Sequence, residues 1–148
     1  MTLYYFPRAC SLAPHIIIEE SGFSYQRVLV DLRTASNKGS EYLSLNPLGA
    51  IPALSVDDWV LTETHSILTY LGDTAPNGPM LPASGDPDRY RAHQWMNFLS
   101  SSIHTYIRSI FRPSAYAPAD DLVSQAAVRE KGRSNLALAV ERLEARLT

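Results

Sequence analysis

Residues 46–71, NPLGAIPALSVDDWVLTETHSILTYL, decide the fold of this chain. The stretch opens with Asn46-Pro47-Leu48-Gly49, which predicts a turn because proline presets φ and glycine tolerates positive φ. The apolar run at 50–54 predicts a strand. Its Pro52 cannot donate to a sheet ladder, so it belongs at the first residue of a strand, at an edge or in a cis turn.

The second half of the stretch predicts a hairpin and then a helix start. Asp57-Asp58 forms the hairpin tip, residues 59–61 form the returning strand, and Thr62-Glu63-Thr64 opens a helix. A helix N-terminus offers free N–H groups and a positive dipole, which suit a small carboxylate. This pattern fits an extended, zwitterionic, peptide-like ligand that pairs with the backbone of Ile51. A strand-initial proline and a threonine-capped helix also occur in folds that bind no ligand, so the rest of the chain has to decide.

The composition excludes several function classes. A net charge of −2 over 148 residues and a pI of 6.0 argue against nucleic acid or an anionic membrane as partners. No run approaches the roughly 18 apolar residues that span a bilayer, and the N-terminus lacks a signal-peptide pattern. The single cysteine excludes an intrachain disulfide, and no residue spacing suggests a metal site. We therefore expect a cytoplasmic protein of one domain, or one domain plus part of another.

The flanking patterns predict a four-stranded mixed sheet with helices on its faces. The predicted elements are strand 2–6, helix 12–21, strand 25–30, a short helix around 41–43, strands 52–56 and 59–61, and helix 64–75. Pro14 lies in the first turn of its helix, where a missing N–H is tolerated, and Gly22 ends that helix. The first two strands are parallel because a helix separates them, and the last two are antiparallel because a tight turn joins them.

The second half of the chain predicts helices. Residues 76–85 hold three prolines and two glycines and indicate an interdomain linker. Asp86-Pro87 then predicts an N-cap followed by a first-turn proline, with a helix to about Phe111. A last helix begins near Asp120. Each helix carries an apolar stripe at helical spacing: Met96, Leu99, Ile103, Tyr106 and Ile110 in the first, and Leu136, Val140, Leu143 and Leu147 in the second.

Cys10 is the first candidate for chemistry. It lies between the first strand and the first helix, where the helix dipole stabilises a thiolate, so we expect its pKa to fall below the ~8.5 of free cysteine. Ala13 stands where a dithiol motif would place its second cysteine, so a mixed disulfide on Cys10 would have no resolving thiol in the chain. The alternative is that Cys10 is a small buried apolar residue.

A polar stripe on the long helix is the second candidate. Its members are Asn97, Ser101, His104 and Arg108. The spacing places them on one face of a regular helix, away from the apolar stripe. Histidine is a common acid–base residue, so His104, facing a thiol, would help to hold a thiolate. A solvated helix face is the alternative explanation, although this stripe is not rich in Lys and Glu.

Together these residues resemble the cytosolic glutathione transferases, most closely the bacterial beta class. The resemblance rests on LYYFPRACSLAPHI, VDLRT, NPLGAIPAL and LTETHSIL-YL, and on His104 in the long helix. It covers nearly the whole chain. It implies an α/β thioredoxin-like domain with the order βαβαββα and a cis proline at Pro52, over residues 1–78. A linker at 79–86 and an all-α domain at 87–148 that looks incomplete would follow.

The resemblance also implies roles for individual residues. Cys10 and His104 would be catalytic, beside the glutathione sulfur. The glutathione-binding residues would be Ala9, Leu32, Arg33, Ile51, Pro52, Glu63, Thr64, Asn97 and Ser101. Ile51 would pair with the cysteinyl backbone, while Glu63 and Thr64 would hold the γ-glutamyl end. Leu32 and Arg33 would line the glycyl end, and Asn97 would reach across from a dimer partner.

The chain departs from the family pattern at several points. Thr64 replaces the usual serine but keeps the hydroxyl, Ser101 replaces an acidic residue, and Thr105 replaces a lysine that often follows the histidine. Family members usually continue for several more helices beyond the point that corresponds to Thr148. The helical domain therefore looks unfinished, and its apolar stripes lack partners. The chain is then a fragment, a partly traced protein, or a truncated form that oligomerises.

The resemblance implies an enzyme with glutathione as co-substrate and no metal. It would conjugate the glutathione thiolate to small electrophiles, exchange thiols and disulfides through Cys10, or do both, with disulfide reductase or peroxidase activity as a further expectation. A bacterial, cytoplasmic homodimer with a role in detoxification is implied, with an electrophile or disulfide as substrate and with neither nucleic acid nor membrane as partner. The alternative is a non-catalytic module that dimerises or stores a ligand.

Overall fold

The computed structural model describes residues 1–147. The chain divides into two compact units, Met1–Ala92 and His93–Thr148, so the division falls within a helix. No helix among the described residues is both long enough and apolar enough to span a bilayer.

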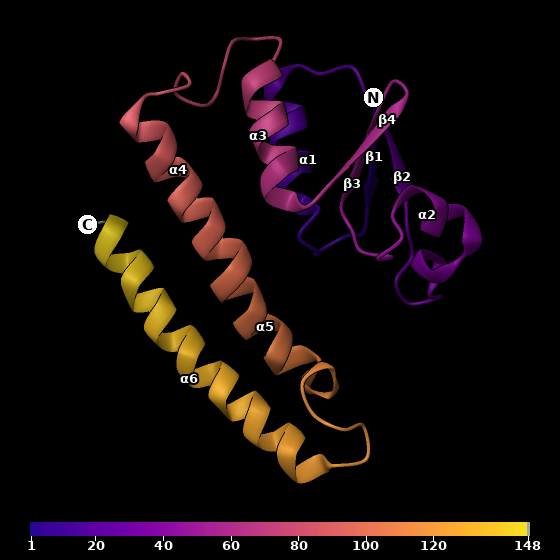
Figure 1. Cartoon of the computed structure of the whole chain (residues 1–148), viewed down its shortest axis with the longest axis vertical. Helices are drawn as coiled ribbons and strands as arrows, with labels where there is room; N and C mark the ends of the chain where they lie inside the picture. The colour runs from indigo at the N-terminus through magenta and orange to yellow at the C-terminus, as the bar shows by residue number, and fades with distance from the viewer. Residues whose placement is uncertain (148) are drawn as a thin grey trace. The chain divides into compact units, whose positions relative to one another are not determined.

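The first unit is a four-stranded mixed sheet with three helices, as predicted (Figure 1). The strands are β1 (Thr2–Tyr5), β2 (Gln26–Leu29), β3 (Ala53–Val56) and β4 (Trp59–Thr62), and the helices are α1 (Leu12–Ser21), α2 (Ser40–Leu45) and α3 (Thr64–Thr74). The sheet order is β2-β1-β3-β4, with β1 and β2 parallel and the other two pairs antiparallel. The fold class inferred from the sequence is therefore confirmed.

Two apolar clusters hold the helices against the sheet. Helices α1 and α3 lie side by side on one face and α2 lies at the other (Figure 1). The α1–α3 face buries Leu54 together with Ile18 and Ile67, and the α2 face buries Ala53 with Tyr42. Consecutive residues of β3 point to opposite faces because side chains alternate along a strand. This is why the apolar run at 50–54 has no polar alternation.

The linker is attached to the first unit by defined hydrogen bonds. The N–H of Met80 donates to the carbonyl of Gly72 at 2.8 Å. Arg89 donates two hydrogen bonds of 2.7 Å to the carboxylate of Asp73 and a third, of 2.9 Å, to the carbonyl of Pro82. This side chain is largely buried, and its bidentate geometry is the strong form of an ion pair.

The second unit is a helical hairpin interrupted by a π-helical turn. Its elements are α4 (Pro87–Phe98), which starts in the first unit, a π turn η2 (Leu99–Ile103), α5 (His104–Phe111), a short 3-10 turn η3 (Pro113–Ala115) and α6 (Leu122–Leu147). The sequence predicted a regular helix as far as Phe111, and the π turn is a correction. The hydroxyls of Ser100 and Ser101 both donate to the carbonyl of Asn97. Such bonds compete with the α-helical ladder and favour a local distortion.

The expectation that the two apolar stripes lack partners is wrong, because α5 and α6 pack against each other. The buried residues of α6 are small, Gly132 and Ala139. Leu99, the first residue of the π turn, is exposed, whereas Ile103, Tyr106 and Ile110 are half-buried. Val140 and Leu147 are also exposed. Hydrophobicity alone does not identify a helix face that is buried through its small residues.

Candidate active site

Cys10 lies in the loop between β1 and α1 and is half-buried. Its Sγ donates a hydrogen bond to the backbone carbonyl of Ile51 at 3.1 Å. The hydroxyl of Thr64, the first residue of α3, also forms a hydrogen bond with this sulfur. Three segments that are far apart in the sequence therefore meet at one thiol within the first unit, as the sequence analysis expected for Cys10, Ile51 and Thr64.

Ser11 fixes the position of the neighbouring Cys10, and the sequence analysis did not single it out. Its side chain is 1% exposed, and its hydroxyl accepts from the N–H of Phe6 at 3.1 Å and donates to the carbonyl of Phe6 at 3.0 Å. This pair of bonds ties the end of β1 to the start of α1. A serine immediately before a predicted helix is the usual sign of a cap, which was the available signal.

Replacing Ser11 by alanine is expected to lower the free energy of unfolding by about 2 kcal/mol, because the N–H of Phe6 loses its partner away from water. Ser44→Ala is the matched control, since the Ser44 hydroxyl is exposed and bonds only within its own helical turn. Urea unfolding of the two variants gives the comparison. Equal stabilities would show that the Ser11 bonds do not hold the loop.

The expected fall in the pKa of Cys10 is wrong, because the structure raises it. Burial is the main cause, since it disfavours the charged thiolate, and the nearby carboxylate of Glu63 adds to the effect. The Thr64 hydroxyl and the backbone N–H groups of Cys10 and Ser11 act in the opposite direction but do not outweigh burial. The sequence located the helix N-terminus correctly but gave no measure of burial.

Titration of the thiol by its ultraviolet thiolate absorbance should therefore give a pKa above that of an unstructured cysteine. Thr64→Val should raise the pKa further, and Glu63→Gln should lower it. Because the folded pKa exceeds the unfolded one, the thiol stabilises the fold below pH ~8.5, and this contribution is lost as the pH rises through the folded pKa. Cys10→Ala should remove that part of the pH dependence. A wild-type pKa below that of a free thiol would contradict the assignment.

The turn before β3 presents the backbone of Ile51. The Ile51-Pro52 peptide bond is cis, which confirms the expectation for Pro52. The carbonyl of Ala50 accepts hydrogen bonds from the hydroxyl of Tyr42 at 2.6 Å and from Nδ2 of Asn46 at 2.8 Å. The turn is thus held by buried side chains on the protein side.

Glu63 is the N-cap of α3 and has a backbone conformation that non-glycine residues rarely adopt. Its φ is 66° and its ψ is 121°, and its side chain makes no capping hydrogen bond. A residue in such a region stores of order 1–3 kcal/mol, and these residues cluster at functional sites. Its carbonyl still accepts the first helical bond, from the N–H of Ile67 at 3.0 Å. The exposed carboxylate of Glu63 therefore lies at the N-terminus of α3.

Arg33, which was expected to line the glycyl end of glutathione, is already paired with a carboxylate of the chain. Arg33 donates to both carboxylate oxygens of Asp31, at 2.9 and 2.7 Å, so its charge is already paired. This pairing lowers the pKa of Asp31 to about 2. Leu32 is half-buried and packs against the cluster on the α2 face, as does Ala9. Arg33 therefore already has an anionic partner in the chain, and its place at the glycyl end of glutathione remains a prediction.

Lys38 is a cation that the sequence analysis missed. A Cβ added to Gly49 would lie 3.2 Å from Nζ of Lys38, so the ammonium lies beside the backbone that leads to Ile51. No ion pair involves Lys38 within residues 1–147. The two positions are distant in the sequence, and no local pattern indicates that they meet.

His104, Asn97 and Ser101 belong to the second unit and are all exposed. His104 begins α5, and its N–H donates back to the carbonyl of Leu99 across the π turn. Arg108 is exposed as well, so all four residues of the predicted polar stripe are solvent-accessible although the π turn interrupts the helix between them. The approach of His104 to the thiol remains a prediction.

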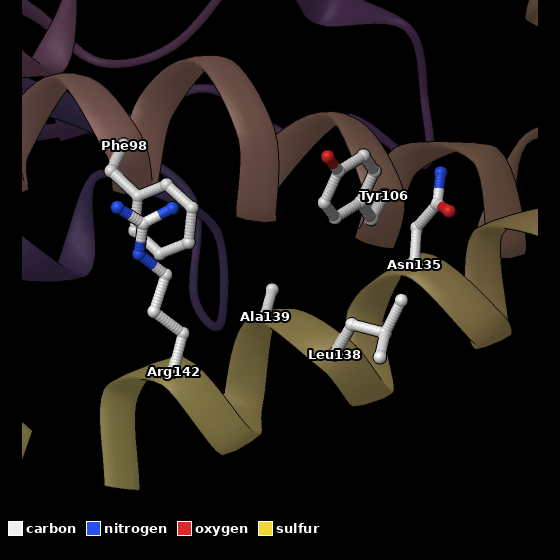
Figure 2. Close-up of a pocket in the computed structure, with 6 residues that line it drawn as sticks. All are labelled: Phe98, Tyr106, Asn135, Leu138, Ala139 and Arg142. Atoms are coloured by element: carbon white, nitrogen blue, oxygen red, sulfur yellow. The ribbon is translucent and has the colours of Figure 1, made fainter. Parts of the chain in front are cut away.

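The second unit also carries two shallow hollows between its helices, of about 190 and 180 Å³. Figure 2 shows one of them, where the guanidinium of Arg142 lies against the ring of Phe98. None of the predicted site residues lines either hollow. Within residues 1–147, no group of three or more His, Cys, Asp or Glu side chains is arranged to hold a metal ion.

Comparison with known proteins agrees with this geometry. The family model for the N-terminal domain of glutathione S-transferase matches residues 1–73. Glutathione S-transferase GST-4.5 of Xanthomonas campestris pv. campestris is 35% identical over 147 residues, which are 99% of this chain and 70% of that protein. The chain belongs to the glutathione S-transferase family. The family inferred from the sequence is thus confirmed.

Solved structures of other family members extend the likeness to the fold of the whole described chain. A glutathione transferase homologue from Sulfitobacter with bound glutathione is 32% identical, with a TM-score of 0.86, and the match covers 97% of this chain and 68% of that one. The beta-class glutathione S-transferase of Sphingomonas chungbukensis is 35% identical, with a TM-score of 0.72, over 88% of this chain and 65% of that one. The chain thus spans about two thirds of the length of these glutathione transferases.

Proposed function

We propose that this family member is a glutathione transferase of the bacterial beta class, which binds glutathione in its first unit. One observation carries the proposal: the sulfur of Cys10 lies 3.1 Å from the carbonyl of Ile51 and within hydrogen-bond reach of Thr64 at the start of α3. A strand-like backbone segment suits an extended peptide and a helix N-terminus suits its carboxylate, and the Cys10 thiol lies between the two, where the ligand's own sulfur would be.

The bound glutathione would lie along the backbone at Ile51, beside Pro52 and Ala9. Its γ-glutamyl amino group would pair with the carboxylate of Glu63, and its α-carboxylate would accept from Thr64 and from the first N–H groups of α3. At the other end, Lys38 is the unpaired cation for the glycyl carboxylate, because Asp31 already neutralises Arg33. Leu32 would line that end.

Two reactions use this arrangement. In conjugation, the glutathione thiolate forms a bond to an electrophilic carbon, and the leaving group departs with its electron pair. In exchange, the Cys10 thiolate attacks one sulfur of a disulfide and the other leaves as a thiolate. Glutathione thiolate then resolves the mixed disulfide, because Ala13 supplies no second thiol. The raised pKa keeps Cys10 protonated at neutral pH, which suits a hydrogen-bond donor to the glutathione thiolate in conjugation.

The second unit would complete the enzyme. His104 would approach the thiolate with Ser101 nearby, and Asn97 would act from the partner of a homodimer. We propose the domain bounds 1–78 and 87–148 with a linker at 79–86, a cytoplasmic location, and a small electrophile or disulfide as substrate. Disulfide reductase and peroxidase activities belong to the same proposal. The first is thiol exchange at Cys10. In the second, the Cys10 thiolate takes an oxygen from a hydroperoxide, which leaves as an alcohol or water, and glutathione condenses with the resulting sulfenic acid to a mixed disulfide with loss of water.

A second candidate is a non-catalytic module of the same family that dimerises or stores a ligand. It is favoured by the exposed apolar side chains of the second unit, among them Leu99, Phe111 and Leu147. Exposed apolar surface of this kind marks an interaction site. This candidate also predicts glutathione binding without turnover.

Glutathione affinity tests the proposal. Wild-type protein should be retained on glutathione resin and should release heat on calorimetric titration with glutathione. Thr64→Val should weaken binding about tenfold, since it removes a hydrogen bond to a charged group. Thr69→Val is the matched control on the same helix, because the Thr69 hydroxyl bonds only to the carbonyl of His65. No retention and no heat with wild-type protein would overturn the proposal, and equal losses in both variants would remove Thr64 from the site.

A further inference from the structure

The turn before β3 is held from the side of α2 by two buried side chains, Tyr42 and Asn46. Tyr42 is 5% exposed and Asn46 is 3% exposed. Asn46 is the C-cap of α2 and follows Tyr42 by four residues, so the two side chains lie on the same side of the helix. The hydroxyl of Tyr42 and Nδ2 of Asn46 both donate to the carbonyl of Ala50. A carbonyl oxygen has two lone pairs, so these two donors occupy it fully.

Both groups are present as donors at neutral pH. Burial raises the pKa of Tyr42 to about 12, so the phenol keeps its proton. The amide of Asn46 does not titrate. Its Oδ1 accepts from the N–H of Leu48 at 3.1 Å, which leaves Nδ2 to face the carbonyl of Ala50. The two hydrogen bonds therefore hold the Ala50 carbonyl in one direction.

A fixed carbonyl also fixes the N–H on the other side of the same peptide unit. The bond between Ala50 and Ile51 is trans, and in a trans peptide the C=O and the following N–H point in opposite directions. The N–H of Ile51 therefore points away from Tyr42 and Asn46. It donates no hydrogen bond within residues 1–147, although Ile51 is only 9% exposed.

A buried N–H without a partner is rare in folded proteins. The carbonyl of the same residue, Ile51, already accepts from Sγ of Cys10. The free N–H and the thiol thus meet at one residue, and an extended peptide that binds there would offer a backbone carbonyl to this N–H. The direction in which the N–H points is set by the two side chains on α2.

We propose that Tyr42 and Asn46 are positioning residues, which orient the N–H of Ile51 toward the cysteinyl carbonyl of bound glutathione. They act through the carbonyl of Ala50. That the ligand is glutathione rests on the proposed function. The orientation of the peptide unit does not, because both hydrogen bonds are made in the free protein.

Calorimetric titration with glutathione tests the proposal in Tyr42→Phe, Asn46→Ala and the double variant. Tyr42→Phe removes the hydroxyl and keeps the ring. Each single variant should raise Kd about twofold, because the other donor still holds the carbonyl, and the double variant about tenfold, the contribution of one neutral hydrogen bond. Two independent effects would multiply to only about fourfold.

Turnover separates positioning from a purely structural role. In the double variant KM for glutathione should rise while kcat stays unchanged, because the ligand makes this bond in the ground state and the transition state alike. A purely structural role would lower the free energy of unfolding and leave this KM unchanged. Circular dichroism establishes that the variants are folded at the assay temperature.

Tyr4→Phe is the matched control. The ring of Tyr4 packs against that of Tyr42, with centroids 5.8 Å apart, but within residues 1–147 its hydroxyl donates no bond to Ala50. This variant should bind glutathione as the wild type does. Equal losses in Tyr4→Phe and Tyr42→Phe would overturn the proposal, as would an unchanged affinity in the double variant.

Amide NMR of the free protein distinguishes a failure of the proposal from a failure of the proposed function. The Ile51 resonance should broaden in the double variant, as the peptide unit samples other orientations, and should stay sharp in Tyr4→Phe. An Ile51 resonance that stays sharp in the double variant would overturn the proposal. If it broadens while the wild-type protein does not bind glutathione, the proposed function is refuted and the orienting role of Tyr42 and Asn46 stands.

Discussion

Replacing Cys10 by alanine is expected to lower the rate of glutathione-dependent disulfide exchange at least about a hundredfold. The reaction needs a protein thiolate to form the mixed disulfide, and the chain has no other cysteine to replace it. Glutathione binding should change little, because Ile51, Glu63 and Thr64 are untouched. The measurement is the reduction of a small disulfide by glutathione, followed for the wild type and Cys10→Ala at equal concentration.

Conjugation should respond differently to the same change. If Cys10 acts there as a hydrogen-bond donor to the glutathione thiolate, Cys10→Ala should reduce the rate by only about tenfold, and Cys10→Ser, which keeps a donor, by less. The exchange rate of the wild type should also rise with pH up to the raised pKa of Cys10, since only the thiolate attacks. Unchanged exchange in Cys10→Ala would rule out a mixed disulfide on this residue. Equal losses in the two reactions would mean that the thiol has one shared role.

The first unit was largely predictable because its signals are local. Helix α1 runs over Leu12–Ser21 as predicted, since Pro14 suits a first turn and Gly22, at a φ of 78°, ends the helix in the left-handed conformation that glycine tolerates. Strand β3 begins at Ala53, one residue after the prediction, because Pro52 lacks an N–H. Turn and breaker residues fix such boundaries whatever the surrounding packing.

The sequence predicted which residues meet at the site, but it did not predict the direction in which the pKa of the Cys10 thiol is shifted. Cys10, Ile51 and Thr64 meet as expected, whereas the pKa of the thiol moves in the opposite direction. The sign depends on how deeply the sulfur is buried and on the distance to the Glu63 carboxylate, and neither is a property of the local sequence. Lys38 beside Gly49 is a further example, because its proximity follows from the path of the loop between β2 and α2.

The second unit was harder to predict because its packing depends on small residues and on a break in helical register. Hydrophobic spacing at 136–147 identified half-buried leucines but not the buried Gly132 and Ala139, which carry little hydrophobic signal. The π turn over Leu99–Ile103 depends on serine hydroxyls that bond to the carbonyl of Asn97. A periodicity argument assumes a constant rotation per residue and therefore cannot locate such a turn.

Gly132→Val is expected to lower the free energy of unfolding by about 3–4 kcal/mol, a larger effect than that of Ser11→Ala. A Cβ at Gly132 would lie 2.2 Å from Oγ of Ser109 and 3.1 Å from the carbonyl oxygen of Tyr106. The Ser109 hydroxyl would have to rotate and give up its hydrogen bond to Tyr106, and the backbone oxygen has little room to move. The gain of roughly 1 kcal/mol from removing glycine from a helix is too small to offset this. Urea unfolding measures the loss.

Two companion variants separate the clash from other effects of valine. Ala137→Val introduces the same side chain at an exposed position of α6, where its weak helix propensity alone should cost under about 1 kcal/mol. In a double-mutant cycle, Ser109→Ala removes the closest contact, so Gly132→Ala should be better tolerated in its presence than alone. The difference arises because the methyl group then meets open space where the hydroxyl stood, leaving only the Tyr106 carbonyl and Ile110. If Gly132→Val and Ala137→Val were equally stable, α5 and α6 would not be in contact at Gly132.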